Sequence, residues 1–144
     1  EILFIPNMRY EYAFDLQQVA EDVSIRMFPH VKVDRIKCLR SYGSSTRGTI
    51  ARCHALGKVM QLAMAVDAFY ALEFLTEKFN KLSEEEKVKV VIHELMHIPE
   101  SFGGGFKHHD VVTDRNGNRC YDLYLKLKEN EEKTDWFKLQ KKKN

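Results

Sequence analysis

His93-Glu94-Leu95-Met96-His97 is the stretch on which the interpretation of this 144-residue chain depends. Two histidines four positions apart on a helix lie one above the other on the same face, so both imidazoles can reach a single metal ion. Glu94 lies beside that face, three residues before His97, where a carboxylate can take a proton from a water that the metal activates. These five residues therefore predict a metal site with a general base next to it.

The flanking sequence predicts that this stretch is helical. Ser83 and Glu86 form a capping-box pattern, and the acidic residues 84–86 suit the positive end of a helix dipole. Apolar residues then recur at helical spacing, namely Val88, Val91, Ile92, Leu95 and Met96. Because Pro99 disfavours continuation of a helix, we expect it to end near residue 98, after about four turns.

The motif needs a third metal ligand from outside the helix. A catalytic zinc commonly has three protein ligands and an open fourth position, and a helical HExxH is the signature of zinc peptidases. We therefore predict zinc as the cofactor and peptide-bond hydrolysis as the reaction. Residues 103–105 are three glycines that allow the chain to bend back, which brings either His108 or His109 to the site. Glutamates that offer an alternative third ligand are Glu100, Glu129, Glu131 and Glu132.

The composition is that of a folded domain with nearly balanced charge. With 44% hydrophobic residues the chain can bury a core, and its formal net charge of +2 neither requires nor excludes a nucleic-acid partner. No apolar run approaches the roughly 18 residues of a membrane span, and residues 1–6 are too short and lack the basic start of a signal peptide. Three widely spaced cysteines without a CxxC pair predict reduced thiols and a cytoplasmic protein. We expect one domain over residues 1–144, with a charged C-terminal tail from about residue 131.

The remaining chain predicts a small α+β fold. Before the motif we expect a helix at 13–28, strands at 31–39, 49–56 and 59–66, and a helix at 70–82. The first two strands are a hairpin candidate, because a loop of small residues at 40–48 joins them. After the motif we expect an extended piece at 111–113, an Asn-Gly turn at 114–118, a helix over about 119–130 and a frayed lysine tail. This order is that of a minimal zincin-like domain, in which a mostly antiparallel sheet packs on helices that include the HExxH helix. Its edge strand could hold an extended peptide by main-chain pairing.

Four pieces of the sequence carry a family resemblance. They are Arg40-Ser41-x-Gly43-Ser44 with Arg47 and Ala51-Arg52, Phe79-Asn80-Lys81-Leu82-Ser83-x-x-Glu86-Lys87, Val91-Ile92-His93-Glu94-Leu95-Met96-His97-Ile98-Pro99, and Phe102-Gly103-Gly104 followed by a basic residue and His109. Residues 37–112, about half the chain, thereby resemble a family of small archaeal and phage metallopeptidases related to SprT-like zincins. The resemblance implies a zinc site formed by His93, His97 and His109, with Glu94 as general base and a peptide or protein as substrate. His108 departs from the family pattern and stays the alternative ligand.

Two other functions remain open at this point. A non-catalytic, zinc-stabilised binding module would use the metal to tie the glycine-rich segment to the helix, and would have four protein ligands. Glu94 would then have no role. A SprT-like protease that works near DNA would use Arg40, Arg47, Arg52 and the C-terminal lysines, and its DNA binding would depend on salt. Candidates for stabilising the transition-state oxyanion are His108, Tyr121 and an arginine of the loop 40–48.

Overall fold

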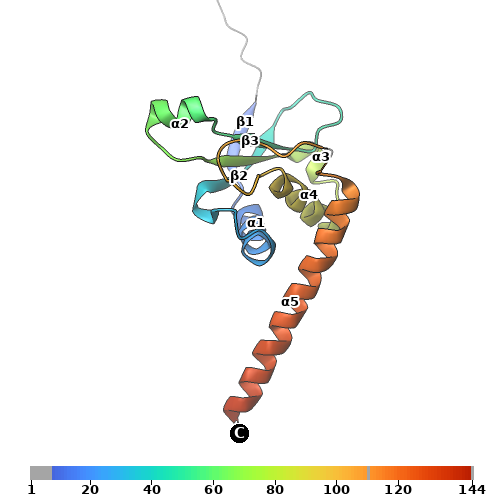
Figure 1. Ribbon diagram of the computed structural model, residues 1–144. Helices are drawn as coiled ribbons and strands as arrows, with labels where there is room; N and C mark the ends of the chain where they lie inside the picture. Colours follow the sequence, from blue (N-terminus) through green and yellow to red (C-terminus); the bar gives the residue numbers. More distant parts are fainter. Residues whose placement is uncertain (1–7, 110, 144) are drawn as a thin grey trace, which may run out of the picture.

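A mixed four-stranded sheet with the order β1-β2-β4-β3 forms the centre of the computed structural model, which describes residues 8–109 and 111–143. The strands are β1 (Arg9–Tyr12), β2 (Ile36–Tyr42), β3 (Ala51–Ala55) and β4 (Tyr70–Leu75). The outer pairs β1–β2 and β3–β4 are antiparallel, whereas the central pair β2–β4 is parallel. The sheet and its helices give the α+β fold that the sequence predicted (Figure 1). Residues 1–6, which are too short for a signal peptide, lie outside the described residues.

Helices α1 (Phe14–Met27) and α4 (Glu84–Met96) pack on the same face of the sheet (Figure 1). The buried core between these layers takes residues from the two helices and from alternating positions of the strands. They include Leu16, Ala20, Val23, Ile36, Cys38, Tyr70, Leu72, Phe74, Val91 and Leu95. The helix predicted at 13–28 is thus confirmed, and the HExxH helix is held by the central part of the core.

Helix α4 is fixed at both of its ends. The predicted capping box is present, since the Glu86 N–H donates to Ser83 Oγ at 3.2 Å and the Ser83 N–H donates to Glu86 Oε2 at 3.4 Å. Beyond the last turn, His30 Nε2 donates to the Ile98 carbonyl at 3.1 Å. The helix therefore begins where the capping box indicated and ends at Met96, two residues before the expected end.

The segment between β3 and α4 corrects three predictions. Residues 59–66 are not a strand, because the chain forms the short helix α2 (Lys58–Met64) there. Residues 70–82 are not one helix, because they form β4 and the short helix α3 (Thr76–Phe79). The hairpin between the first two strands is also wrong, since β4 lies between β2 and β3 and pairs with both. The physical reason is that β4 is buried on both faces, so its sequence lacks the alternation that marks a half-exposed strand.

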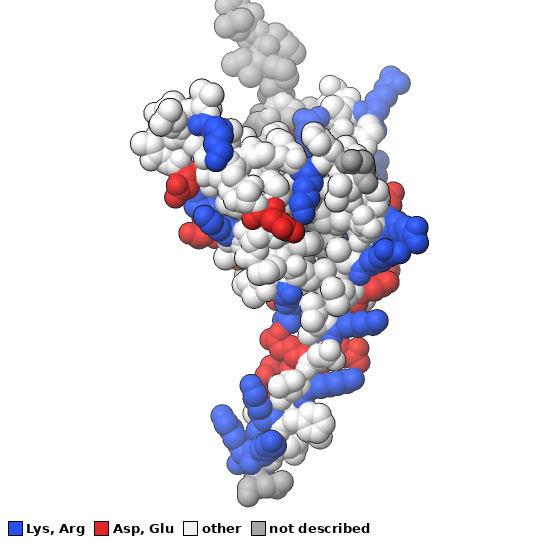
Figure 2. Space-filling view, viewed as in Figure 1, with Lys and Arg blue, Asp and Glu red and all other residues white. Residues whose placement is uncertain are grey.

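The C-terminal part corrects the sequence prediction as well. A single helix, α5 (Asp114–Lys143), replaces the predicted turn at 114–118, the helix at 119–130 and the frayed tail. Thr113 Oγ1 accepts the Asn116 N–H at 3.2 Å, which caps the first turn and makes Asn116-Gly117 helical. Its first half packs on α1 and α4, and its exposed end projects from the body with lysines gathered there (Figures 1 and 2). Within the described part of the chain, no helix is both long and apolar enough to cross a membrane.

Candidate metal centre

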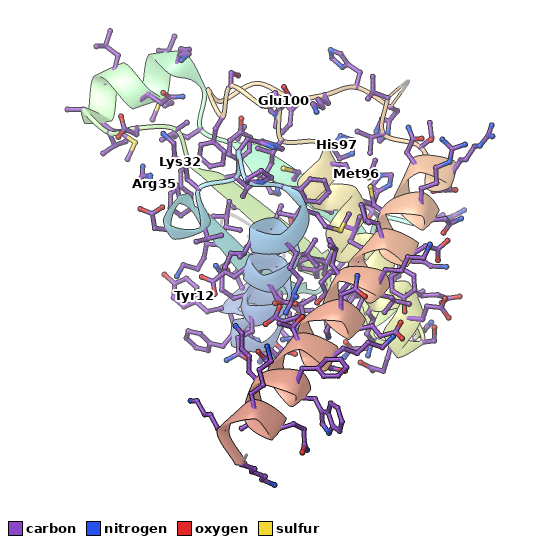
Figure 3. All side chains as sticks on the ribbon, turned by 60° about the horizontal axis from the view of Figure 1, so that its bottom comes forward. Tyr12, Lys32, Arg35, Met96, His97 and Glu100 are labelled. Carbon is purple, nitrogen blue, oxygen red and sulfur yellow. The ribbon has the colours of Figure 1, made fainter. Side chains whose placement is uncertain are left out.

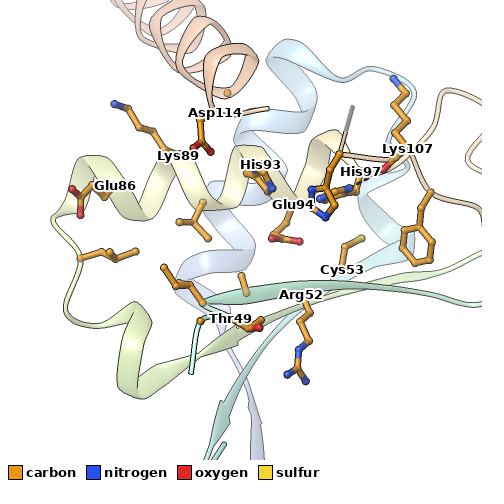
Figure 4. Close-up of a pocket in the computed structure, with 18 of the residues that line it drawn as sticks. Thr49, Arg52, Cys53, Glu86, Lys89, His93, Glu94, His97, Lys107 and Asp114 are labelled. Atoms are coloured by element: carbon orange, nitrogen blue, oxygen red, sulfur yellow. Dashed lines mark hydrogen bonds between the residues drawn. The ribbon is translucent and has the colours of Figure 1, made fainter. Parts of the chain in front are cut away.

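A cleft of about 1100 Å³ lies along one side of α4. Its walls are α4, the strand β3 with the residues just before it, the segment 106–109 and the first turn of α5. His93, Glu94 and His97 project from α4 into this space, and Cys53 of β3 lies opposite Glu94 (Figure 4). The three motif residues therefore share one solvent-accessible space.

Three imidazoles meet on the floor of the cleft. Among the described residues, the candidate ligand atoms of His93, His97 and His109 all lie within 4.8 Å of one another. The ring centroids of His97 and His109 are 4.8 Å apart, and those of His93 and His97 are 5.1 Å apart. His108 also lines the cleft but does not belong to this group. The structure thus brings His109, rather than His108, to the helical pair.

The chemistry of this donor set fits a metal ion. His97 Nδ1 lies 2.8 Å from the carbonyl oxygen of Lys107 and must donate to it, which leaves Nε2 free as a ligand. Burial lowers the pKa of His93, and the neighbouring imidazoles of His97 and His109 lower it further, against the opposing charge of Asp114. Since metals bind the neutral imidazole, both observations favour the ligating form. Three imidazoles are a ligand set of catalytic zinc sites.

Glu94 is buried beside the histidines. Only 7% of its surface is exposed, and burial raises the pKa of its carboxyl group to about 7. In Figure 4 its side chain points from α4 toward β3. A divalent cation nearby would lower this pKa again, because its charge favours the carboxylate. A carboxyl group whose pKa lies near neutrality can both accept and return a proton during a reaction.

The loop that carries His109 is fixed to the sheet and to α4. The Gly104 N–H donates to Tyr70 Oη at 2.9 Å, and the Tyr70 hydroxyl donates to the Gly105 carbonyl at 2.8 Å. Two residues later, the Lys107 N–H donates to the His97 carbonyl at 2.8 Å. Lys107 is therefore bonded to His97 through both its N–H and its carbonyl. This network connects the buried strand β4 with His97, one of the three clustered histidines.

Helix α2 supports the same loop from the other side. Gln61 Nε2 donates to the carbonyls of Gly103 at 3.0 Å and Leu56 at 2.7 Å. Gly104 has a φ of +102°, and a Cβ there would come within 2.5 Å of both Gln61 Nε2 and the Leu56 carbonyl oxygen. Glycine is required at this position both by the backbone conformation and by the close contact. In Figure 3 the loop leaves α4 near His97, passes α2 and returns to the start of α5.

The other candidate ligands are not brought to this place. Glu100 is exposed and does not line the cleft, and neither do Glu129, Glu131 and Glu132 of α5. Glu131 instead pairs with Arg26 of α1. His54 is exposed, and its Nε2 lies 2.8 Å from Glu73 Oε1. Cys38, Cys53 and Cys120 are free thiols, in agreement with the predicted reduced state.

Of the candidate oxyanion donors, some line the cleft and others do not. His108 lines the cleft, whereas Tyr121 and Arg47 do not. Arg40 is engaged by Asp15 through two hydrogen bonds of 2.6 and 2.7 Å. Residues that sequence reasoning did not single out are Tyr70, Gln61, Lys107 and Asp114. Thr113 is a good N-cap, so the sequence contained a local pattern for a helix that starts at Asp114. No local pattern predicts the hydrogen bonds that Tyr70, Gln61 and Lys107 make with the backbone of distant residues.

The comparisons with known proteins agree with this geometry at the level of a family. No curated protein and no solved structure matched the chain. A family described as "Putative phage metallopeptidase" matches residues 8–130, a range that contains the sheet, α4 and all three histidines. Membership in such a family implies a peptidase that uses a metal and acts on peptides or proteins. The chain belongs to this family of phage metallopeptidases.

Proposed function

We propose that this protein is a zinc-dependent peptidase in which His93, His97 and His109 hold the metal and Glu94 is the general base. The observation that carries the proposal is the convergence of three imidazoles and one buried carboxyl group on the floor of a cleft. When bound there, zinc would lower the pKa of water and polarise the scissile carbonyl.

Glu94 moves the proton in the proposed reaction. Its carboxylate accepts a proton from the attacking water and delivers it to the leaving amine, so that the same group acts as base and then as acid. Lys107 holds the ring of His97 through its carbonyl, which fixes the orientation of that ligand. The burial of Glu94 lowers its contact with bulk water, which strengthens the electrostatic interactions of its carboxylate.

The strand β3 offers a binding edge for the substrate. Within the described residues it is the last strand of the sheet and pairs only with β4, and its residues 51–53 line the cleft. An extended peptide could therefore add to this edge by main-chain hydrogen bonds, with its backbone held across the metal site from α4. The main-chain part of such binding would not depend on the side chains of the peptide.

The alternatives have less support. In a purely structural zinc site the burial of Glu94 against the metal ligands would have no function, and an uncompensated buried carboxyl group costs stability. For a DNA-associated protease, Arg40 is already paired with Asp15 and the free lysines lie at the far end of α5. We therefore place peptide hydrolysis first.

Replacing Glu94 by Gln tests the proposal. Glu94→Gln keeps the shape of the side chain but removes the base, so we expect zinc binding to persist while kcat for an unfolded, fluorescein-labelled protein falls by about 10²–10⁴-fold. Glu100→Gln, the same change on the exposed loop, should leave kcat unchanged. If Glu94→Gln cleaves as fast as the parent, Glu94 is not the base.

A further inference from the structure

The lining of the cleft includes three aliphatic side chains. Ile50 precedes β3, Leu82 precedes α4 and Val90 lies on the second turn of α4, and all three line the cleft. Each is only partly buried and packs against the core with the rest of its surface. Three separate segments thus expose aliphatic side chains to the cleft.

One of these side chains, Val90, is close to the proposed site of reaction. Val90, His93, Glu94 and His97 follow the i, i+3, i+4, i+7 pattern and occupy one face of α4. Val90 therefore lies about one turn, roughly 6 Å along the axis, before Glu94. An extended peptide advances about 3.3 Å per residue. A substrate residue one or two positions from the scissile bond would consequently place its side chain at Val90.

The charged groups near Val90 are engaged elsewhere. Lys89 Nζ pairs with Glu85 Oε1 at 3.4 Å and lies 5.2 Å from the ring centroid of Tyr121. Glu86 belongs to the capping box of α4, and its side chain is exposed. Both Lys89 and Glu86 line the cleft, but each is already engaged within α4 or its N-cap. In Figure 4 the side chain of Lys89 points away from β3.

We infer that Ile50, Leu82 and Val90 form a subsite for a bulky apolar side chain next to the scissile bond, so that the preferred substrates are peptides with an aliphatic or aromatic residue there. The inference rests on the proposed peptidase function. Burying such a side chain against three aliphatic residues is favourable, whereas an acidic or basic side chain would lose hydration without a partner. Val90 sets the depth of the subsite because it is the member on the catalytic face of α4.

A cleavage profile tests the inference. The zinc-loaded protein is incubated with a random decapeptide library, and the residues on both sides of each cut are identified by mass spectrometry. We expect aliphatic and aromatic residues to be enriched on one side of the cut. In Val90→Ala, which deepens the subsite, the ratio of kcat/KM for Phe over Leu at that position should rise by at least about tenfold. Ile50→Asn should reduce the preference for apolar residues.

Val88→Ala is the matched control, because Val88 lies on the same helix and packs on the core but does not line the cleft. Its profile should equal that of the parent. A parent profile without apolar enrichment, or a Val90→Ala profile identical to that of Val88→Ala, overturns the subsite while the peptidase function stands. Peptide binding to Glu94→Gln, followed by fluorescence anisotropy, separates the two claims. The peptidase proposal fails if the parent protein cleaves no peptide. In that case the subsite is still supported if Glu94→Gln binds Leu peptides more tightly than Asp peptides. Equal binding of both peptides overturns the subsite as well.

Discussion

His108 and His109 are neighbours in the sequence, but the structure gives them different places. The candidate ligand atom of His109 lies within 4.8 Å of those of His93 and His97, whereas His108 lines the cleft outside this group. Spacing alone left both histidines open, because a flexible glycine-rich bend can deliver either one. The family resemblance favoured His109 as the third ligand, and His109 is the histidine that lies beside His93 and His97 in the structure.

Exchanging these two histidines for alanine should therefore have unequal effects on zinc binding. We expect His109→Ala to weaken zinc affinity by more than the roughly 10–100-fold that loss of an outer-shell partner costs. His108→Ala should change it little, which makes it the matched control. Competition with a chromophoric chelator measures both affinities. The opposite order of effects would make His108 the third ligand.

The helical part of the site could be predicted because its information is local. His93 and His97 need only an i, i+4 spacing on a capped helix, and both the helix and its capping box are present. The hydrogen bonds of Tyr70 to Gly104 and Gly105 join residues more than 30 positions apart in sequence. No local pattern announces such contacts, so the support of the metal ligands could not be read from the chain.

Among the elements, the loop between α4 and α5 is the one on which the site depends. It contains Gly104, whose φ of +102° and tight contacts with α2 exclude a side chain, and Gly105, around which a Cβ would meet nothing within 4 Å. These two adjacent glycines allow a direct test of whether the loop positions the ligands.

Gly104→Ala should displace the loop, because the new methyl group would overlap Gln61 and the Leu56 carbonyl in an unfavourable backbone conformation. We expect zinc affinity to fall by roughly 10–100-fold, as for loss of an outer-shell partner. Gly105→Ala should bind zinc like the parent. Calorimetric titration of both variants with zinc compares them, and equal affinities would show that the loop does not control the site.

The order of the elements also shows where local patterns mislead. Residues 59–66 form an apolar run, yet α2 is almost wholly exposed. The run therefore lacks the apolar stripe at helical spacing by which a helix can be distinguished from a strand in the sequence. Residues 70–75 contribute Leu72 and Leu75 to an apparent helical stripe, although they form a strand buried on both faces. Pairing of β4 with both β2 and β3 decides the outcome, and this pairing is long-range.

At the scale of the whole molecule, an ion pair connects α1 with the sheet. Arg40 of β2 donates two hydrogen bonds to Asp15 of α1, and this contact lowers the pKa of Asp15 from 3.8 to about 2. Since the folded pKa is below the unfolded one, the pair stabilises the native state above pH 3.8, and this contribution is lost as the pH falls toward 2.

Asp15→Asn should therefore lower the free energy of unfolding of the metal-free protein at pH 7 by about 0.5–1 kcal/mol, a value limited by the exposure of the pair. The difference from the parent should vanish by about pH 2. Urea unfolding at several pH values measures it, with Asp135→Asn on the exposed end of α5 as control. A difference that is independent of pH would contradict the linkage.

The zinc coordination of the intact protein tests the central claim most directly. X-ray absorption at the zinc edge, on protein loaded with one equivalent of zinc, gives the number and type of the ligands. We expect three imidazole nitrogens and one non-protein oxygen, at the roughly 2.0–2.1 Å typical of such bonds. Four protein ligands, a sulfur ligand or fewer than three imidazoles would contradict a catalytic zinc site formed by His93, His97 and His109.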